Sequence, residues 1–384
     1  MRCAAAEKKE KPMGLKELRE GLAASLIERD GEIDALLLGL VAREHVLFIS
    51  PPGCAKTQLA MSLAGAIQGA NVFVRLLDKF TTPEELFGPL KLSALKADRY
   101  ERAIAGYAPT AHIILFDEPF KASTAILNTT LTLLQERQYD NGGIRISCPL
   151  RVAIGASNEV PSAEEGRELS AVFDRFLIRR MMRPIAPSSH ERLMFDDLLP
   201  VKQCATLTEI DAAAQAARLL PISGSGKEAL LQIVAELNAA GVRPSDRRMR
   251  KAVGVARAAA MIDGAAEVQV GHLEPLADVL WDDPAQADKA AEIVQRIANP
   301  VGSKLNEILR EVEQIAAAAV DKAAAMAAVP KLEKCKAKAD HLAKSGNGRA
   351  AKLVEAINDR IIMVTAKAMD RSEDKVRAFL AATK

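Results

Sequence analysis

The chain has 384 residues, a length that predicts at least two units, each burying its own core. Charged residues make up 27% of the sequence and nearly cancel to a net charge of +2, so the composition indicates neither a nucleic-acid partner nor an anionic membrane surface. Aromatic residues account for only 4%, which favours helices over an aromatic-rich sheet.

The five cysteines are scattered without CxxC spacing, which argues against a disulfide framework and against a zinc site. No apolar run approaches the roughly 20 residues that a membrane span needs, and the N-terminal segment lacks the apolar centre of a signal peptide. We therefore expect a cytoplasmic protein without a membrane span.

Residues 1–13 are charged, contain proline and predict a flexible tail. From residue 15 to residue 41 apolar residues recur at helical spacing with a break at Asp30-Gly31, which predicts two helices. The pattern then changes to short apolar runs of strand length that are separated by helical segments. These runs span residues 45–50, 72–77, 112–117, 151–157 and 176–182.

Strands that alternate with helices predict an α/β domain with a mainly parallel sheet, whose ligands bind at the carboxyl ends of the strands. We expect this domain to span residues 14–187. Strand patterns are absent from the sequence between residues 188 and 300, where helical segments predict an all-α lid domain. Further helical stripes predict a C-terminal helical domain over residues 301–384.

The segment SPPGCAKT, residues 50–57, joins a predicted buried strand to a predicted helix, which is the position of a phosphate-binding loop. In such a loop backbone N–H groups surround the phosphates, the Lys56 amine reaches the outer phosphates and the Thr57 hydroxyl holds Mg²⁺. The strict pattern GxxxxGK[ST] requires glycine where Ser50 and Ala55 stand, so an ordinary strand-to-helix turn is the alternative.

Two adjacent carboxylates, Asp117 and Glu118, follow the apolar run of the third predicted strand. Because this strand end is expected beside the phosphate loop, Asp117 can hold Mg²⁺ through water and Glu118 can orient or deprotonate the attacking water. A solvated acidic turn is the alternative. The predicted Mg²⁺ ligands are Thr57 and Asp117, and the predicted nucleotide-binding residues are Pro52, Gly53, Cys54, Ala55, Lys56, Thr57, Gln58 and Asp117.

Longer phrases of the sequence resemble the MoxR family of AAA+ ATPases, especially its RavA branch. They are TTPEELFGPL, YAPTAHIILFDEPFKASTAILNTTLTLLQERQYDNGG, PLRVAIGASNEVPS and ELSAVFDRFLIRR. The resemblance runs from about residue 31 to residue 300 and implies a AAA+ αβα core with a helical lid. Members of that branch often have AKS or AKT where other ATPases have GK, so Ala55 fits the branch, whereas Ser50 departs from the pattern.

The resemblance implies three further catalytic residues. Asn158 in GASNEVP corresponds to sensor 1, whose neutral polar side chain can fix the attacking water. Arg175 in FDRF corresponds to the arginine finger that completes the site of the next subunit. Arg247 in RPSDRRMRKAV corresponds to the sensor 2 arginine that touches the γ-phosphate from the lid. Arg248 is close enough to be the sensor instead, and a basic exposed helix face is a further alternative.

Two segments resemble parts of this clade that face the pore of a ring and contact the client. Residues 80–107 correspond to the helix-two insert, and residues 136–150 to a hairpin before sensor 1. The sequence Asn141-Gly142-Gly143 between strand-like flanks is a turn signal that supports the hairpin. Surface decoration is the alternative for both segments.

The resemblance implies an ATP- and Mg²⁺-dependent hydrolase that assembles as a homo-oligomer, expected to be a hexamer. Such a ring remodels, assembles or activates a protein client in a chaperone-like way, and the family commonly works with a partner that bears a von Willebrand factor A domain. One alternative is a AAA+ motor acting on nucleic acid, which the near-neutral charge disfavours. The other is a structural ring that binds nucleotide without turnover.

Overall fold

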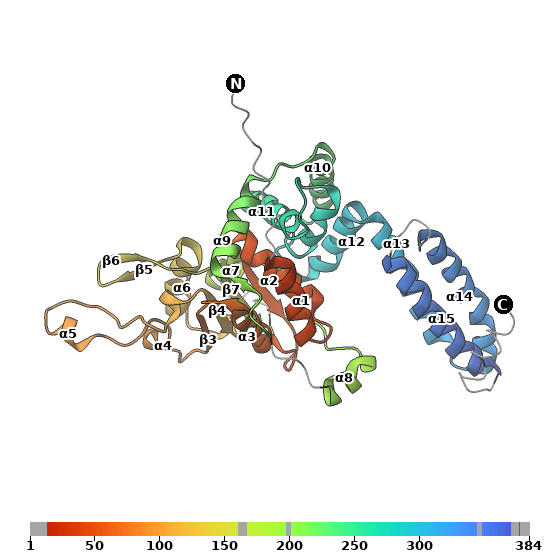
Figure 1. Ribbon diagram of the computed structural model, residues 1–384, viewed down its shortest axis with the longest axis horizontal. Helices are drawn as coiled ribbons and strands as arrows, with labels where there is room; N and C mark the ends of the chain where they lie inside the picture. Colours follow the sequence, from red (N-terminus) through yellow and green to blue (C-terminus); the bar gives the residue numbers. More distant parts are fainter. Residues whose placement is uncertain (1–13, 160–166, 197–200, 344–347, 370–375, 377–384) are drawn as a thin grey trace, which may run out of the picture. The chain divides into compact units, whose positions relative to one another are not determined.

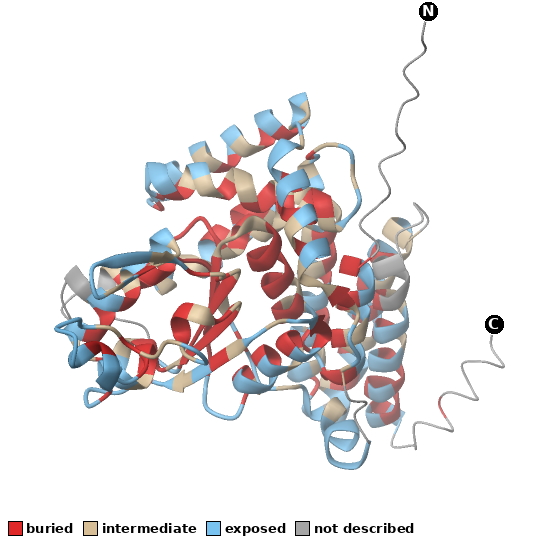
Figure 2. Cartoon of the chain, turned by 60° about the vertical axis from the view of Figure 1, so that its left-hand side comes forward, coloured by how far each residue is buried: buried red, intermediate tan, exposed pale blue. Residues whose placement is uncertain are grey.

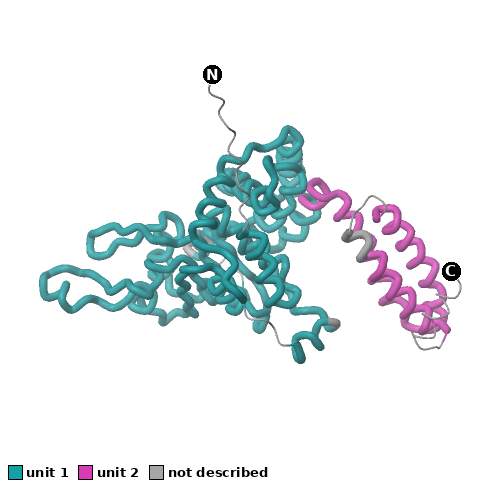
Figure 3. Tube along the Cα trace, in the orientation of Figure 1, with its two compact units in different colours: residues 1–293 teal, residues 294–384 magenta. Residues whose placement is uncertain are grey.

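The computed structural model describes residues 14–159, 167–196, 201–343, 348–369 and 376 (Figure 1). The chain forms two compact units, residues 1–293 and residues 294–384 (Figure 3). The predicted tail at residues 1–13 lies outside the described residues. The predicted core and most of the predicted lid belong to the first unit, and the boundaries that we placed at residues 187 and 300 remain predictions.

The first unit contains a five-stranded parallel sheet in the order β3-β4-β7-β1-β8. Each strand lies within one of the five predicted runs, which confirms the α/β fold. The three central strands are buried along nearly their whole length (Figure 2), which explains their continuous apolar sequences. The strands are β1 His45–Ile49, β3 Val72–Leu76, β4 Ile113–Asp117, β7 Val152–Ser157 and β8 Phe176–Met181.

The register of the strands brings their carboxyl ends to one edge of the sheet. Ile49 at the end of β1 pairs with Ser157 of β7 on one side and with Met181 of β8 on the other. Asp117 at the end of β4 pairs with Ala156 of β7. Segments that leave these strands therefore start next to one another, at the edge where α/β sheets bind ligands.

Two N-terminal helices precede the sheet, as the sequence predicts. The break between them falls at residues 26–29 and not at Asp30-Gly31, because Asp30 starts the second helix and its carboxylate is favourable near the helix N-terminus. Other helices connect the strands. The helices of this part are α1 Gly14–Ser25, α2 Asp30–Ala42, α3 Lys56–Ala66, η2 Pro119–Lys121, α6 Thr124–Glu136 and α7 Arg167–Arg175.

Helices dominate the chain after β8, and polar caps mark several of their starts. The Thr206 hydroxyl accepts a hydrogen bond from the Glu209 N–H at the start of α9, and Ser223 and Ser245 cap α10 and α11. The helices are η3 Pro187–Ser189, α8 His190–Phe195, α9 Leu207–Leu219, α10 Gly224–Ala239, α11 Asp246–Ile262, η4 Val270–Asp278, η5 Pro284–Gln286 and α12 Ala287–Ala298.

The expectation that strands end before residue 188 is wrong at one place. The short strand β9 Ala205–Thr206 pairs in parallel with β2 Ile67–Gln68, which follows α3. A two-residue strand has no periodic pattern, so the sequence carries no signal for it.

Two segments project from the same side of the first unit (Figure 1). One contains α4 Pro83–Phe87, α5 Leu92–Leu95 and η1 Ala108–Thr110, and the other is the predicted hairpin of β5 Gln138–Asn141 and β6 Ile144–Ser147. The Arg102 N–H donates to Asn141 Oδ1 at 2.7 Å, and Asn141 Nδ2 donates to the Arg102 carbonyl at 3.2 Å. These paired hydrogen bonds join the two segments.

The second unit is helical in its described part, as the apolar stripes predict. Its helices are α13 Pro300–Ala318, α14 Lys322–Ala343 and α15 Gly348–Met369. Side chains from all three helices form its core, including Leu305, Ile308, Leu332 and Ile357.

Arg248 holds α11 against β8 and the segment after η4. Its side chain is 1% exposed, and its Nη1 donates to the carbonyls of Leu177 at 3.1 Å and Val279 at 2.8 Å. Its Nη2 donates to Asp174 Oδ1 at 3.0 Å, and its Nε lies 2.9 Å from Asp282 Oδ1. The Arg248 guanidinium therefore stabilises the fold of the first unit.

Arg248→Met should lower the free energy of unfolding of the first unit by about 3 kcal/mol, because it leaves buried carbonyls and two carboxylates without their donor. Urea unfolding followed by the fluorescence of Trp281 measures this, since Trp281 is the only tryptophan of the sequence and is buried in this unit. Arg250→Met, on the exposed side of α11, should change stability by less than about 0.5 kcal/mol. Equal effects of the two substitutions would contradict this role of Arg248.

Candidate functional site

Three segments meet at the carboxyl edge of the sheet. The phosphate loop, residues 50–56, follows β1, the pair Asp117 and Glu118 ends β4, and Asn158 follows β7. The pairing of β7 with both β1 and β4 brings these segments together, so the predicted loop, carboxylates and sensor 1 lie in one place.

The phosphate loop turns through two residues with positive φ. They are Gly53 with φ 82° and Ala55 with φ 61°, which directly precedes α3. An alanine in this conformation costs about 1–2 kcal/mol, which indicates that its surroundings fix the turn. Ser50 does not have a positive φ; its N–H donates to the Ser157 carbonyl at 3.0 Å and its hydroxyl to the Pro51 carbonyl at 3.0 Å. The backbone therefore does not require glycine at residue 50.

The Lys56 amine lies at the centre of the site. It donates to Asn158 Oδ1 at 2.7 Å and to the Ser50 carbonyl at 3.4 Å, and the residue is 8% exposed. Within the described part of the chain, no carboxylate forms an ion pair with this amine. A buried ammonium hydrogen-bonded only to neutral oxygens favours an anionic ligand beside it, because its charge is desolvated.

The Glu118 carboxylate is held at the end of β7. The Asn158 N–H donates to its Oε1 at 3.2 Å, and the Ser157 hydroxyl donates to its Oε2 at 3.3 Å. The Lys121 amine lies 3.5 Å from the same Oε2. Glu118 itself has φ 51° and is 7% exposed, so a strained backbone positions a buried carboxylate next to the sensor residue.

Asp117 and Thr57 offer the oxygen ligands that Mg²⁺ prefers. Burial raises the pKa of Asp117, the charge of Lys56 lowers it and the charge of Glu118 raises it again. A divalent cation beside Asp117 would offset the cost of its desolvated charge. The part of the chain that the structure describes holds no cluster of three or more His, Cys, Asp or Glu side chains. Mg²⁺ typically uses one or two protein ligands together with substrate phosphates.

An apolar cavity of about 180 Å³ adjoins the phosphate loop. Its walls come from the break between α1 and α2, from the phosphate loop with the start of α3, and from the segment after β8. No sequence pattern predicts this cavity, because its only signals are the break between the first two helices and the end of the last strand of the sheet. The lining residues are Leu26, Ile27, Arg29, Pro52, Gly53, Cys54, Ala55, Gln58, Pro184, Ile185 and Leu193.

Arg175 lies at the opposite edge of the sheet. It directly precedes β8, whose first residue Phe176 pairs with His45, the first residue of β1. The phosphate loop follows the far end of β1, and a strand of five residues is about 16 Å long. The Arg175 side chain therefore cannot reach the phosphate site of its own chain.

Arg247 lies beside Arg175. The Nη1 atoms of Arg175 and Arg247 are 3.5 Å and 3.8 Å from Asp174 Oδ2. Burial lowers the pKa of Arg175, and the charge of Arg247 lowers it further. The structure therefore groups Arg247 with the predicted arginine finger, away from Lys56, while Arg248 is buried nearby with its Nη1 donating to the carbonyls of Leu177 and Val279.

Comparisons with known proteins agree with this geometry. Residues 13–215 match the family described as the MoxR domain in the MoxR-vWA-beta-propeller ternary systems, and residues 227–294 match an AAA lid domain. The chain belongs to the MoxR family of AAA+ ATPases. Two similar proteins of Methanocaldococcus jannaschii are MJ0812, 37% identical over 290 residues, and MJ0079, 38% identical over 272 residues. These alignments cover 74% and 70% of this chain and 76% and 70% of the relatives.

A solved structure shares the fold of this MoxR ATPase. It comes from Cytophaga hutchinsonii, is described as that of an ATPase and has a TM-score of 0.60 at 18% identity, covering 74% of this chain and 93% of its own. The predicted MoxR-type AAA+ identity, the α/β core with helical regions and the ATP hydrolase activity are thereby confirmed. The RavA branch remains a prediction.

None of the helices in the described part of the chain combines the length and the apolarity that a membrane crossing requires.

Ser50→Gly should leave the affinity for a fluorescent ADP analogue within about threefold of the wild type, because the Ser50 hydroxyl bonds only to the neighbouring carbonyl. Lys56→Ala should weaken this affinity at least about tenfold, since it removes the buried cation of the site. Equilibrium fluorescence titration measures both. A tenfold gain in affinity from Ser50→Gly would instead mean that the serine impairs the loop.

Proposed function

We propose that this MoxR ATPase works as a homo-oligomeric ring, with six subunits, that binds ATP with Mg²⁺ between neighbours and uses hydrolysis to remodel a protein client. The position of Arg175 carries the proposal. Arg175 is too far from Lys56 of the same chain to contact a nucleotide bound there. In a ring its charged side chain would instead reach the phosphate loop of a neighbouring copy. An arginine supplied in this way stabilises the charge that develops on the γ-phosphate.

Each residue at the carboxyl edge has a role in this proposal. Lys56 and the N–H groups of the loop bind the phosphates, and Thr57 with Asp117 would hold Mg²⁺, which neutralises charge on the phosphates. Glu118 orients or deprotonates the attacking water. The apolar cavity beside the loop receives the base of the nucleotide.

The hydrogen bond between Lys56 and Asn158 links binding to catalysis. Phosphate oxygens that engage the Lys56 amine would compete with Asn158 Oδ1 for it. The Asn158 side chain would then be released to fix the attacking water, beside the Glu118 carboxylate that accepts its own N–H. A bound triphosphate in this way prepares the water site.

Arg247 acts with Arg175 on the neighbour's nucleotide in this proposal. Both side chains lie within 4.0 Å of one oxygen of Asp174, so a single edge of the chain presents both to the next subunit. Arg248 is a poor sensor candidate because its guanidinium is 1% exposed and bonded to backbone carbonyls. The role of sensor 2 therefore falls to Arg247.

The projecting segments are the proposed client-binding surface. They expose large apolar side chains, among them Leu92 at 75% and Ile144 at 60%. Helix α6 begins six residues after Glu118 and ends directly before β5 of the hairpin, so a rigid element of about 20 Å connects the site to this surface. Movement at the site can thus be transmitted to the client.

A protein with a von Willebrand factor A domain is the proposed partner. The support is the matched family, which is described from MoxR-vWA-beta-propeller ternary systems. The purified chain should co-elute in size-exclusion chromatography with such a domain from the same organism, and Ile144→Asp should reduce binding if the hairpin takes part. Unchanged separate elution of the two proteins with ATP present would contradict the partnership.

Arg175→Ala should lower the turnover number for ATP by at least about a thousandfold, and Glu118→Gln should abolish turnover while ATP still binds. Mixing the two inactive variants should restore part of the rate. The loop and Glu118 of an Arg175→Ala subunit then meet the intact Arg175 of a Glu118→Gln subunit and form a complete site. Steady-state hydrolysis across protein concentration measures this.

A control substitution and a mass measurement complete this test. Arg250 is an exposed arginine of α11, so Arg250→Ala should keep the wild-type rate of hydrolysis. Sedimentation of Glu118→Gln with ATP should give a mass of six times the 41.2 kDa of one chain. A concentration-independent rate with no recovery on mixing would show that Arg175 does not act on a neighbour.

A further inference from the structure

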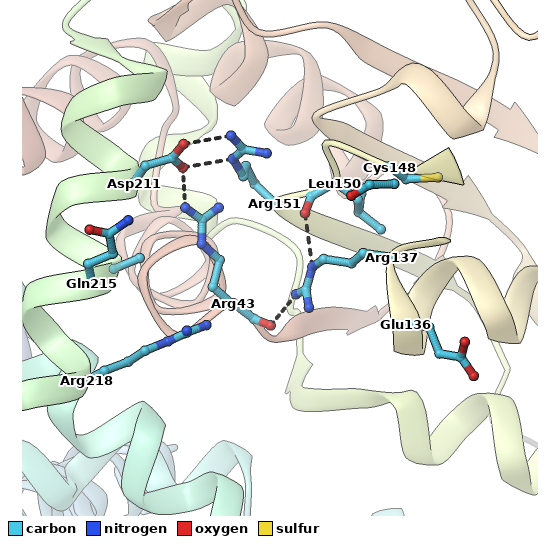
Figure 4. Close-up of a pocket in the computed structure, with 11 residues that line it drawn as sticks. Arg43, Glu136, Arg137, Cys148, Leu150, Arg151, Asp211, Gln215 and Arg218 are labelled. Atoms are coloured by element: carbon cyan, nitrogen blue, oxygen red, sulfur yellow. Dashed lines mark hydrogen bonds and ion pairs between the residues drawn. The ribbon is translucent and has the colours of Figure 1, made fainter. Parts of the chain in front are cut away.

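A second cavity, which is polar, lies at the amino edge of the sheet, away from the phosphate loop (Figure 4). It has a volume of about 310 Å³ and is lined by four arginines from four different segments. Arg43 follows α2 and precedes β1, Arg137 lies between α6 and β5, Arg151 precedes β7, and Arg218 belongs to α9. We call this feature the arginine pocket.

The arginine pocket has excess positive charge. Its lining includes only two carboxylates, Asp211 and Glu136, against the four guanidinium groups. Asp211 Oδ1 and Oδ2 accept hydrogen bonds from Arg151 at 2.8 Å and 2.7 Å, and Asp211 Oδ1 also pairs with Arg43. Both oxygens of the Asp211 carboxylate are thus already paired with Arg151 or Arg43.

The other two arginines have no carboxylate partner among the residues that the structure describes. Arg137 donates its Nε to the Leu150 carbonyl at 3.0 Å and its Nη2 to the Arg43 carbonyl at 2.6 Å, both neutral groups. Arg218 is exposed at the rim. Glu136 does not neutralise them, since its carboxylate pairs with Arg145 at 3.8 Å.

One unbonded buried donor and two residues with positive φ distinguish the pocket from a packed ion pair. Arg43 Nη1 is buried and makes no hydrogen bond within the described part of the chain. Burial is the largest cause that lowers the pKa of both Arg43 and Arg137; the charge of Asp211 opposes it at Arg43 and the charge of Glu44 opposes it at Arg137, while the charge of Arg218 lowers both. Both residues also have positive φ, 61° and 51°, a strain that is commonly stored at functional sites.

We propose that the arginine pocket binds a small anion that carries phosphate groups. Its unused donors come from Arg43, Arg137 and Arg218, which approach from different segments and suit a tetrahedral group with several terminal oxygens. The Asp211 carboxylate already accepts two parallel hydrogen bonds from Arg151, so a planar group with two oxygens is already bound there. A cavity of this volume lies at the lower end of small-molecule sites, which range over about 300–1,000 Å³.

The position of the pocket gives the bound anion a structural effect. Arg137 lies at the base of the β5–β6 hairpin, and Arg218 lies on α9 of the helical region. An anion bound by both would connect the hairpin base to this helix. The proposal does not depend on ring formation or on the phosphate loop.

Isothermal titration with inorganic pyrophosphate in the absence of Mg²⁺ tests the proposal. The full chain carrying Lys56→Ala is used, because this substitution removes the cation of the phosphate loop. One pyrophosphate should bind per chain, and Arg218→Gln in the same background should weaken binding at least about tenfold. Arg218 is exposed, so thermal melting should confirm that the fold is kept.

Arg310→Gln in the same background is the matched control. Arg310 is an exposed arginine of α13 in the second unit, so the substitution changes the net charge equally and should leave pyrophosphate binding unchanged. Citrate, which has three carboxylates and no phosphate, should bind at least about tenfold more weakly than pyrophosphate. Absence of binding, equal loss in both arginine variants, or equal binding of citrate would each overturn the proposal.

Discussion

The parallel pairing of β7 with β1 and β4 is the constraint on which the active site depends. It places the ends of three strands side by side, so that Lys56 can donate to Asn158 and the Asn158 N–H can donate to Glu118. None of these groups is close to another along the chain. Small shifts of register would separate them, because the side chains of a strand alternate between faces with a period of two residues. The buried apolar strands that fix this register therefore position the residues of the candidate site.

Two groups of positively charged side chains lie at the other edge of the same sheet, away from the phosphate loop. Arg175 and Arg247 share Asp174 before β8, and the arginine pocket lies before β1 and β7. Grouped guanidinium groups repel each other and lose hydration, so each cluster stores a cost that an anionic partner relieves. For Arg175 the proposed partner is the nucleotide of a neighbouring subunit, and for the arginine pocket it is a small phosphate compound. One sheet thus has three regions that favour anions, with only one of them at its carboxyl edge.

Helix α6 connects these regions with the projecting hairpin. It starts close to Glu118 and ends at Arg137, which bonds to the carbonyls of Arg43 and Leu150. Paired hydrogen bonds between Asn141 and Arg102 then join the hairpin to the neighbouring insert. A displacement of α6 would therefore move both projecting segments together, because each connection is a short hydrogen bond to backbone. This continuity gives a physical route from nucleotide chemistry to the surface that we propose for the client.

The sequence by itself determined the features that depend on local pattern: the five strands, the phosphate loop, the carboxylates at the end of β4 and the turn of the hairpin. These follow from apolar runs, from glycine and other turn residues, and from the order of motifs along the chain. Only the tertiary structure decided which of Arg247 and Arg248 is buried, where the apolar cavity lies and which arginines gather before β1. The short pairing of β2 with β9 belongs to the same group. Each of these features joins residues that are far apart in sequence, and the energies of burial and charge pairing that select them exist only once the chain has folded.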